Sequence, residues 1–78
     1  MAKELGPAGI RVNAVAPGAI NIPEAPRSDD LTEIFVKDTA LGRIGTPEEI
    51  AKVVRFLVSD DAGFITGEVL GVTGGYRL

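Results

Sequence analysis

The stretch that decides the fold is IRVNAVAPGAI, from Ile10 to Ile20. Its first part, Ile10 to Ala16, is rich in β-branched and apolar side chains, a composition that predicts a strand. An almost continuous apolar run is typical of a strand covered on both faces, as in a parallel sheet. Pro17 and Gly18 follow at once, and we expect them to end the strand because both residue types favour turns.

A second strand of the same character is predicted at Glu68 to Thr73, EVLGVT, where two glycines end it. Helical patterns separate the two strands, so the strands should be parallel and joined by a right-handed crossover. Met1 to Leu5 is typical of the last turn of a further helix, which Gly6 and Pro7 are expected to stop. The predicted fold class is therefore α/β.

The clearest helix is predicted at Pro47 to Ser59. Thr46 precedes it as N-cap and Glu49 stands three residues later, which is a capping box with Pro at the favoured first position. Apolar side chains recur along this helix at helical spacing: Ile50, Val53, Val54, Leu57 and Val58. A shorter helix is expected at Asp30 to Asp38, with Asp30 itself as the cap.

Composition excludes several classes of function. The chain has 78 residues, enough for one small domain at most, and a net charge of −3 with its basic residues scattered, which argues against nucleic-acid binding. It contains no Cys and no His, so disulfides, thiol chemistry and the commonest zinc ligands are excluded, and no metal site is expected. No apolar run reaches membrane-spanning length. The absence of Cys fits a cytoplasmic protein, which is our expectation.

The charged and phenolic side chains carry no catalytic assignment. Three acidic pairs lie at expected helix ends or turns, where capping accounts for the first two: Asp29-Asp30, Glu48-Glu49 and Asp60-Asp61. Three arginines have no spacing that indicates a site: Arg11, Arg43 and Arg55. Tyr76, the only tyrosine, is expected to pack or to be solvated.

The end of the first strand is the best candidate for a ligand site. In open α/β sheets, ligands lie outside the carboxyl ends of the strands, and Pro17 and Gly18 stand at such an end. Taken alone this indication is weak, because Pro-Gly is also common in ordinary turns.

Two longer stretches give this indication its context. They are ELGPAGIRVNAVAPGAI, residues 4–20, and LGRIGTPEEIAKVVRFLVSDDAGFITGEVLGVTGG, residues 41–75. Together they closely resemble the C-terminal part of the short-chain dehydrogenase/reductase family. The resemblance implies a partial Rossmann-type unit, in the order helix end, β, α, α, β, that supplies the last two strands of a doubly wound sheet. Residues 1–78 would then form a single partial domain.

The resemblance also implies NAD or NADP as the cofactor of the intact family. Pro17 and Gly18 would pack beside the nicotinamide ring, and the backbone of Ile20 would hydrogen-bond its carboxamide. Ile22 stands where the family commonly has a Thr whose hydroxyl contacts the cofactor, so that contact is missing here. The segment from Asn21 to Ala40 would correspond to the mobile substrate lid.

Other family landmarks are not present in these 78 residues. The glycine-rich motif T-G-x-x-x-G-x-G, the catalytic Ser and the Y-x-x-x-K motif are absent, and Tyr76 has no Lys four residues later. Thr73 stands where the family tends to have Asp. Our first hypothesis is therefore part of an NAD(P)-dependent oxidoreductase that transfers hydride between the nicotinamide and an alcohol/carbonyl pair. Alone, such a chain would be catalytically incomplete and would not bind the cofactor tightly.

The second hypothesis is a self-standing oligomerisation or interaction module that reuses the βααβ unit. Under both hypotheses we expect a homo-oligomer. Its contacts would involve the helix Pro47–Ser59, the strand Glu68–Thr73 or the edge of Ile10–Ala16. The helix favours this because Ala51 and Phe56 widen its apolar surface beyond the stripe that one core contact requires.

Overall fold

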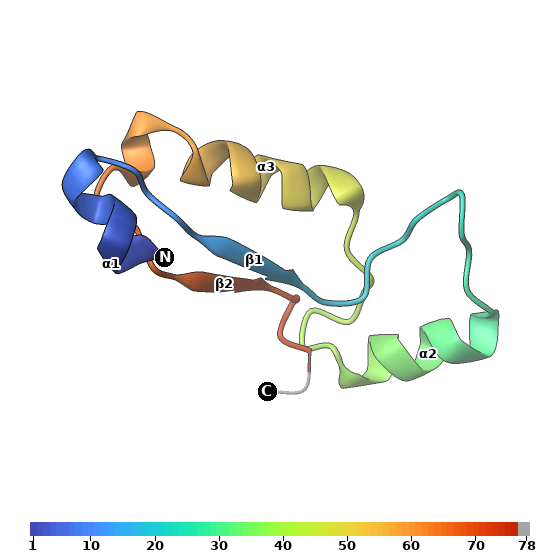
Figure 1. Ribbon diagram of the computed structural model, residues 1–78. Helices are drawn as coiled ribbons and strands as arrows, with labels where there is room; N and C mark the ends of the chain where they lie inside the picture. Colours follow the sequence, from blue (N-terminus) through green and yellow to red (C-terminus); the bar gives the residue numbers. More distant parts are fainter. Residues whose placement is uncertain (77–78) are drawn as a thin grey trace.

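The computed structural model describes residues 1–76 and confirms the α/β class, with two strands separated in sequence by helices (Figure 1). Its elements are the helices α1 (Ala2–Leu5), α2 (Asp29–Asp38) and α3 (Pro47–Leu57), the 3-10 turns η1 (Gly6–Ala8) and η2 (Asp60–Ala62), and the strands β1 (Ala14–Pro17) and β2 (Val69–Val72).

The two strands pair in parallel, as predicted. The register sets Ala14 opposite Val69 and Pro17 opposite Val72. Figure 1 shows α3 lying along one face of this ribbon, whereas α2 lies beyond the carboxyl ends of the strands. The loop between β1 and α2 and the start of α3 therefore meet at the same end of the sheet.

The first strand is shorter than predicted, because Ile10 to Asn13 do not join the ladder. The Val12 N–H donates to the Thr66 hydroxyl at 3.0 Å, and the Asn13 side chain bonds the Ile65 carbonyl and the Glu68 N–H at 3.0 and 3.1 Å. Side chains thus take over part of the pairing, although the Gly67 N–H still donates to the Val12 carbonyl at 2.8 Å, and regular pairing begins only at Ala14.

The other boundaries differ by one or two residues from those predicted. Helix α2 is capped by the Ser28 side chain, which accepts from the Leu31 N–H, and not by Asp30. Helix α3 ends at Leu57, and Ser59 follows it in a turn. Strand β2 ends before Thr73, whose hydroxyl accepts from the Gly75 N–H.

The N-terminal helical segment also continues further than expected. Gly6 is right-handed, with φ −53°, and the chain passes through η1. It turns at Gly9, whose φ of 78° suits Gly because it lacks a Cβ.

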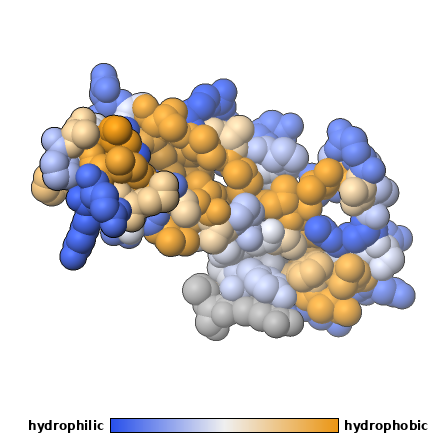
Figure 2. Space-filling model, in the orientation of Figure 1, coloured by the Kyte–Doolittle hydropathy of each residue, from blue (hydrophilic) through white to orange (hydrophobic). Residues whose placement is uncertain are grey.

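The expectation of a strand covered on both faces is wrong for this chain. Val15 is half-buried, while Ala14, Ala16 and Pro17 are exposed. The buried apolar residues are Leu57 and Ala62, at the end of α3 and in η2. Figure 2 shows apolar side chains spread over α3 and the strands instead of being enclosed. Among residues 1–76, no helix has the length and apolar character to cross a membrane.

Candidate functional site

The carboxyl ends of β1 and β2 are held in close contact at Gly18. Its N–H donates to the Val72 carbonyl at 3.0 Å. A Cβ placed on Gly18 would lie 2.9 Å from the Thr73 Cα and 3.1 Å from the Thr73 carbonyl oxygen. Gly is therefore required at this position by the packing of one strand end on the other.

Beyond Gly18 the chain pairs briefly with the segment that leads into α3. The Gly45 N–H donates to the Ala19 carbonyl at 3.0 Å, and the Asn21 N–H donates to the Gly45 carbonyl at 2.9 Å. This parallel bridge sets Ile20 beside Gly45. Since Thr46 caps α3 immediately afterwards, the bridge brings Ile20 next to the first turn of that helix.

One open hollow contains every residue that the sequence assigns to cofactor binding. We call it the Pro17 hollow, and its volume is about 440 Å³. It is lined by Pro17, Gly18, Ile20, Ile22, Arg27, Pro47 and Ile50. Three of these residues, Arg27, Pro47 and Ile50, were missed by the sequence analysis. No spacing in the sequence indicates them, because loop and helix meet only in the folded chain.

The peptide groups of Ile20 face away from the bridge to Gly45. In a parallel bridge the hydrogen bonds belong to the residues on either side, here Ala19 and Asn21, so the N–H and C=O of Ile20 are directed to the other side. The Ile20 carbonyl accepts from Arg27 Nη2 at 3.1 Å. The Ile20 N–H has no hydrogen-bond partner within residues 1–76. A donor and an acceptor thus lie side by side on one residue of the hollow.

The lining of the Pro17 hollow suits contact with an apolar ring more than proton transfer. Of its seven lining residues within the described chain, only Arg27 has a charged side chain, and a guanidinium donates hydrogen bonds but accepts none. In the described part of the chain, no carboxylate, hydroxyl or thiol lines it. The hollow can therefore hold and orient a ligand, while acid–base chemistry would have to come from residues outside it.

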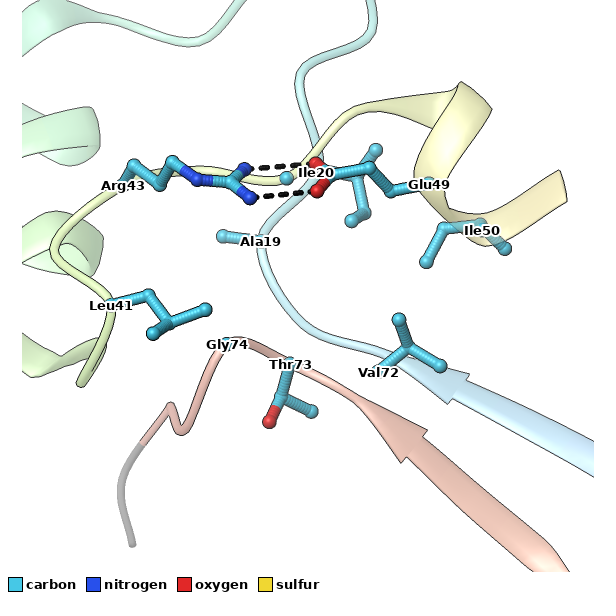
Figure 3. Close-up of a pocket in the computed structure, with 10 residues that line it drawn as sticks. Ala19, Ile20, Leu41, Arg43, Glu49, Ile50, Val72, Thr73 and Gly74 are labelled. Atoms are coloured by element: carbon cyan, nitrogen blue, oxygen red, sulfur yellow. Dashed lines mark hydrogen bonds and ion pairs between the residues drawn. The ribbon is translucent and has the colours of Figure 1, made fainter. Parts of the chain in front are cut away.

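A second, smaller hollow of about 140 Å³ lies next to the first and shares Ile20 and Ile50 with it. Figure 3 shows Arg43 and Glu49 facing each other there, from the loop before α3 and from its first turn. Arg43 Nη1 and Nη2 donate to the two carboxylate oxygens of Glu49 at 2.8 and 2.7 Å. The sequence analysis found no site indication at Arg43, and this pair is its structural role.

The same carboxylate completes the predicted capping box. Glu49 Oε1 accepts from the Thr46 N–H at 3.0 Å, while the Glu49 N–H donates to the Thr46 hydroxyl at 3.2 Å. The Arg43 hydrogen bonds, followed by the Thr46 backbone bond, lower the pKa of Glu49 to about 2. Glu49 in turn raises the pKa of Arg43 above its ordinary value. Glu49 is thus engaged in holding the start of α3.

The expected lid segment, 21–40, comprises an exposed loop and α2. Its far end is fixed to the chain after β2, because the N–H groups of Ala40 and Leu41 donate to the carbonyls of Gly75 and Gly74 at 3.2 and 2.9 Å. Phe35 of α2 contacts Tyr76, with ring centroids 5.6 Å apart, so of the two roles expected for Tyr76, packing or solvation, the structure shows packing.

The remaining acidic residues do not gather into a site. Within residues 1–76 no group of three or more carboxylates lies together in a way that could hold a metal ion. Asp29 lies in the first turn of α2, and Asp60 and Asp61 begin η2. These acidic residues therefore lie at a helix start and at a turn, where they were expected.

Comparison with known proteins places this geometry in context. The family model described as enoyl-(acyl carrier protein) reductase matches residues 1–77. The chain is 47% identical over 75 residues to the 3-oxoacyl-(acyl-carrier-protein) reductase of Thermotoga maritima. The match covers 95% of this chain and 30% of that protein.

Solved structures agree with the sequence relatives. A short-chain dehydrogenase/reductase from Serratia marcescens matches with a TM-score of 0.93 at 38% identity, over 100% of this chain and 32% of that one. A 3-oxoacyl-(acyl-carrier protein) reductase of Brucella melitensis with bound NAD matches with a TM-score of 0.89 at 42% identity. That match covers 99% of this chain and 28% of the reductase. A blue fluorescent protein from a metagenomic library in complex with NADPH matches with a TM-score of 0.90 at 34% identity. That match covers 99% of this chain and 31% of the fluorescent protein. The chain thus spans about a third or less of the length of these proteins.

Proposed function

This chain belongs to the short-chain dehydrogenase/reductase family, and on that premise we propose that it is the C-terminal portion of an NAD(P)-dependent oxidoreductase. In that role it would contribute the nicotinamide-side wall of the cofactor site, the substrate lid and subunit contacts. The reaction of the complete enzyme would be reversible hydride transfer between the nicotinamide and an alcohol/carbonyl pair. We expect this to take place in the cytoplasm.

The observation that carries the proposal is the Ile20 peptide in the Pro17 hollow. A carboxamide presents an NH₂ group that donates and an oxygen that accepts. Ile20 offers a carbonyl, whose oxygen accepts from Arg27 and has a second lone pair, and an N–H with no partner within residues 1–76. The apolar lining around Pro17, Gly18 and Ile22 suits the flat ring that bears such a carboxamide. Residues of this chain therefore fit the nicotinamide end of the cofactor.

The remainder of the cofactor would need groups that these 78 residues do not contain. No glycine-rich phosphate-binding motif stands in the sequence, and the anionic centre of a dinucleotide is normally held by such a loop at a helix N-terminus. We therefore expect the isolated chain to bind NAD or NADP only weakly and to show no hydride transfer.

Complementation tests the proposal. The chain is mixed with the N-terminal part of the Thermotoga maritima reductase, cut where this chain's match to it begins, and oxidation of NADPH by a 3-oxoacyl thioester is followed. Activity should require both parts and be absent with either alone. Restoration by an unrelated helical peptide, or turnover by the 78-residue chain alone, would contradict the proposal.

A second candidate function, the self-standing interaction module, is favoured by the exposed apolar side chains. Phe56 of α3 is 45% exposed, Val69 of β2 is 70% exposed, and Phe64 between them is fully exposed. We propose a homo-oligomer that covers this surface, and the open edges of the two-stranded sheet provide a further contact. A well-folded oligomer that does not complement the Thermotoga fragment would favour this second function over the first.

A further inference from the structure

Arg27 differs from its neighbours in the loop and at the start of α2. All other residues from 21 to 30 are exposed, whereas Arg27 is half-buried. It lines the Pro17 hollow and, of the residues 1–76, is the only charged one there. A half-buried guanidinium at the wall of an open, otherwise apolar hollow keeps donors that water or a ligand can use.

The guanidinium is held on two sides. Its Nη2 donates to the Ile20 carbonyl at 3.1 Å, and its central carbon lies 5.2 Å from the centre of the Phe35 ring. These contacts fix the plane of the group and reduce the conformational entropy that it would lose on binding a ligand.

The charge of Arg27 is not neutralised by the described part of the chain. Within residues 1–76 it forms no ion pair with a carboxylate, and its Nε and Nη1 donors have no hydrogen-bond partner. By contrast, Arg43 uses both terminal nitrogens on Glu49. An oriented guanidinium with unused donors binds anionic oxygens, and phosphate oxygens match its planar fork.

We propose that Arg27 binds a phosphate oxygen of the nicotinamide nucleotide that the Pro17 hollow receives. The proposal rests on the proposed function, because the ring that would occupy the apolar part of the hollow is joined through its ribose to a phosphate. Ile22 lines the same hollow and offers no hydroxyl, so Arg27 is the side chain of that lining able to donate to the phosphate.

Two ligands that differ only in the phosphate test this assignment. Nicotinamide mononucleotide and nicotinamide riboside are titrated to millimolar concentration into the isotope-labelled chain, and the amide resonances of Ile20 and Ile22 are followed. The mononucleotide should bind roughly tenfold more tightly than the riboside, as expected for one charge-assisted contact. In Arg27→Gln, the affinities for the two ligands should become equal, because only the mononucleotide loses a contact to its phosphate.

Arg55→Gln is the matched control, since this exposed arginine on α3 lines neither hollow. Arg27→Lys should retain part of the preference for the mononucleotide over the riboside, because it keeps the positive charge but lacks the planar pair of N–H donors. The ratio of the two affinities is compared within each variant, so a change in the hollow that affects both ligands alike does not alter the result. Equal affinity of the wild-type chain for both ligands, or a preference that survives in Arg27→Gln, would overturn the assignment while leaving the nicotinamide site standing. If neither ligand shifts Ile20 or Ile22, the assignment of Arg27 fails, whereas the proposed function is tested separately by complementation with the Thermotoga fragment.

Discussion

At the scale of single residues, one glycine and one ion pair fix the carboxyl end of the sheet. Gly18 allows β1 and β2 to approach, and the Arg43–Glu49 pair fixes the loop that passes over that end. The sequence marks Gly18 as a ligand-approach position, but the structure gives the packing of Thr73 as its immediate requirement. The two roles are compatible, because the strand ends form the wall of the Pro17 hollow.

Gly18→Ala should therefore destabilise the fold. The added Cβ would meet backbone atoms of Thr73 at 2.9 and 3.1 Å, which cannot move as freely as a side-chain end. We expect a loss of about 1–3 kcal/mol in the free energy of unfolding, measured by urea denaturation. Gly6→Ala is the control, because Gly6 is helical and has no atom within 4 Å of such a Cβ. Equal stability of the two variants would contradict the packing argument.

The Arg43–Glu49 pair predicts a pH dependence. The pKa of Glu49 is lowered in the folded chain to about 2, below its unfolded value of about 4.3, so its ionised form stabilises the fold. The contribution is complete above the unfolded pKa and is lost as the pH falls towards the folded pKa. Melting temperature should decline between these values in the wild type and less steeply in Arg43→Gln. Arg55→Gln should follow the wild type; a steeper decline in Arg43→Gln would refute the prediction.

At the scale of elements, Arg11 joins three segments that are far apart in sequence. Its guanidinium donates to the carbonyls of Leu57 and Ser59, at the end of α3, and of Ile65, before β2. A cation at this position satisfies carbonyls that a helix end leaves without partners.

Arg11→Met should loosen the end of α3 while preserving most of the side-chain stem. We expect a loss of about 1–3 kcal/mol, because charged hydrogen bonds to partly buried carbonyls are removed. Faster hydrogen exchange of the amides near residues 57–65 should accompany it. Arg11→Lys should recover part of the loss, since it can reach fewer of the carbonyls, and a variant as stable as wild type would show that the bonds contribute nothing.

The elements also show what a sequence can and cannot reveal. The start of α3 was predicted correctly because Thr46, Pro47 and Glu49 are neighbours whose capping box is local. The start of β1 was predicted wrongly because contacts from Val12 and Asn13 to the segment before β2 decide it. For the same reason Ile20 and Ile22 were found from a family motif, whereas Arg27 was recognisable only once the loop was folded.

At the scale of the whole molecule, the chain exposes more surface than its mass requires. Its accessible area is 5814 Å², against about 4,500 Å² for a compact protein of 8.1 kDa. The radius of gyration is 15.3 Å, where a compact chain of this length has roughly 11.5 Å. Figure 2 shows that part of the exposed surface is apolar, over α3 and the strands. A partner that covers this surface should therefore stabilise the fold.

Phe56→Glu should weaken self-association. Phe56 lies on the exposed apolar side of α3, and a carboxylate buried in the proposed subunit contact would lack a partner. Light scattering should show the wild type as an oligomer at tens of micromolar, and the variant at least tenfold weaker in association. Lys52→Glu, on the exposed polar side of the same helix, is the control for added negative charge. A wild-type monomer, or equal association of wild type and Phe56→Glu, would count against this contact.

The attachment of α2 at one end only has a kinetic consequence. Backbone bonds fasten residues 40–41 to the chain after β2 and Asn21 to Gly45, whereas the stretch just before α2 is joined to Ile20 through the Arg27 hydrogen bond. The segment should therefore pivot about residues 39–41 without losing its own helix. Breaking the Arg27 bond and the Phe35–Tyr76 contact would cost about 2 kcal/mol. An open form of roughly 3% of molecules would then exist before any ligand arrives, so entry would select this minority.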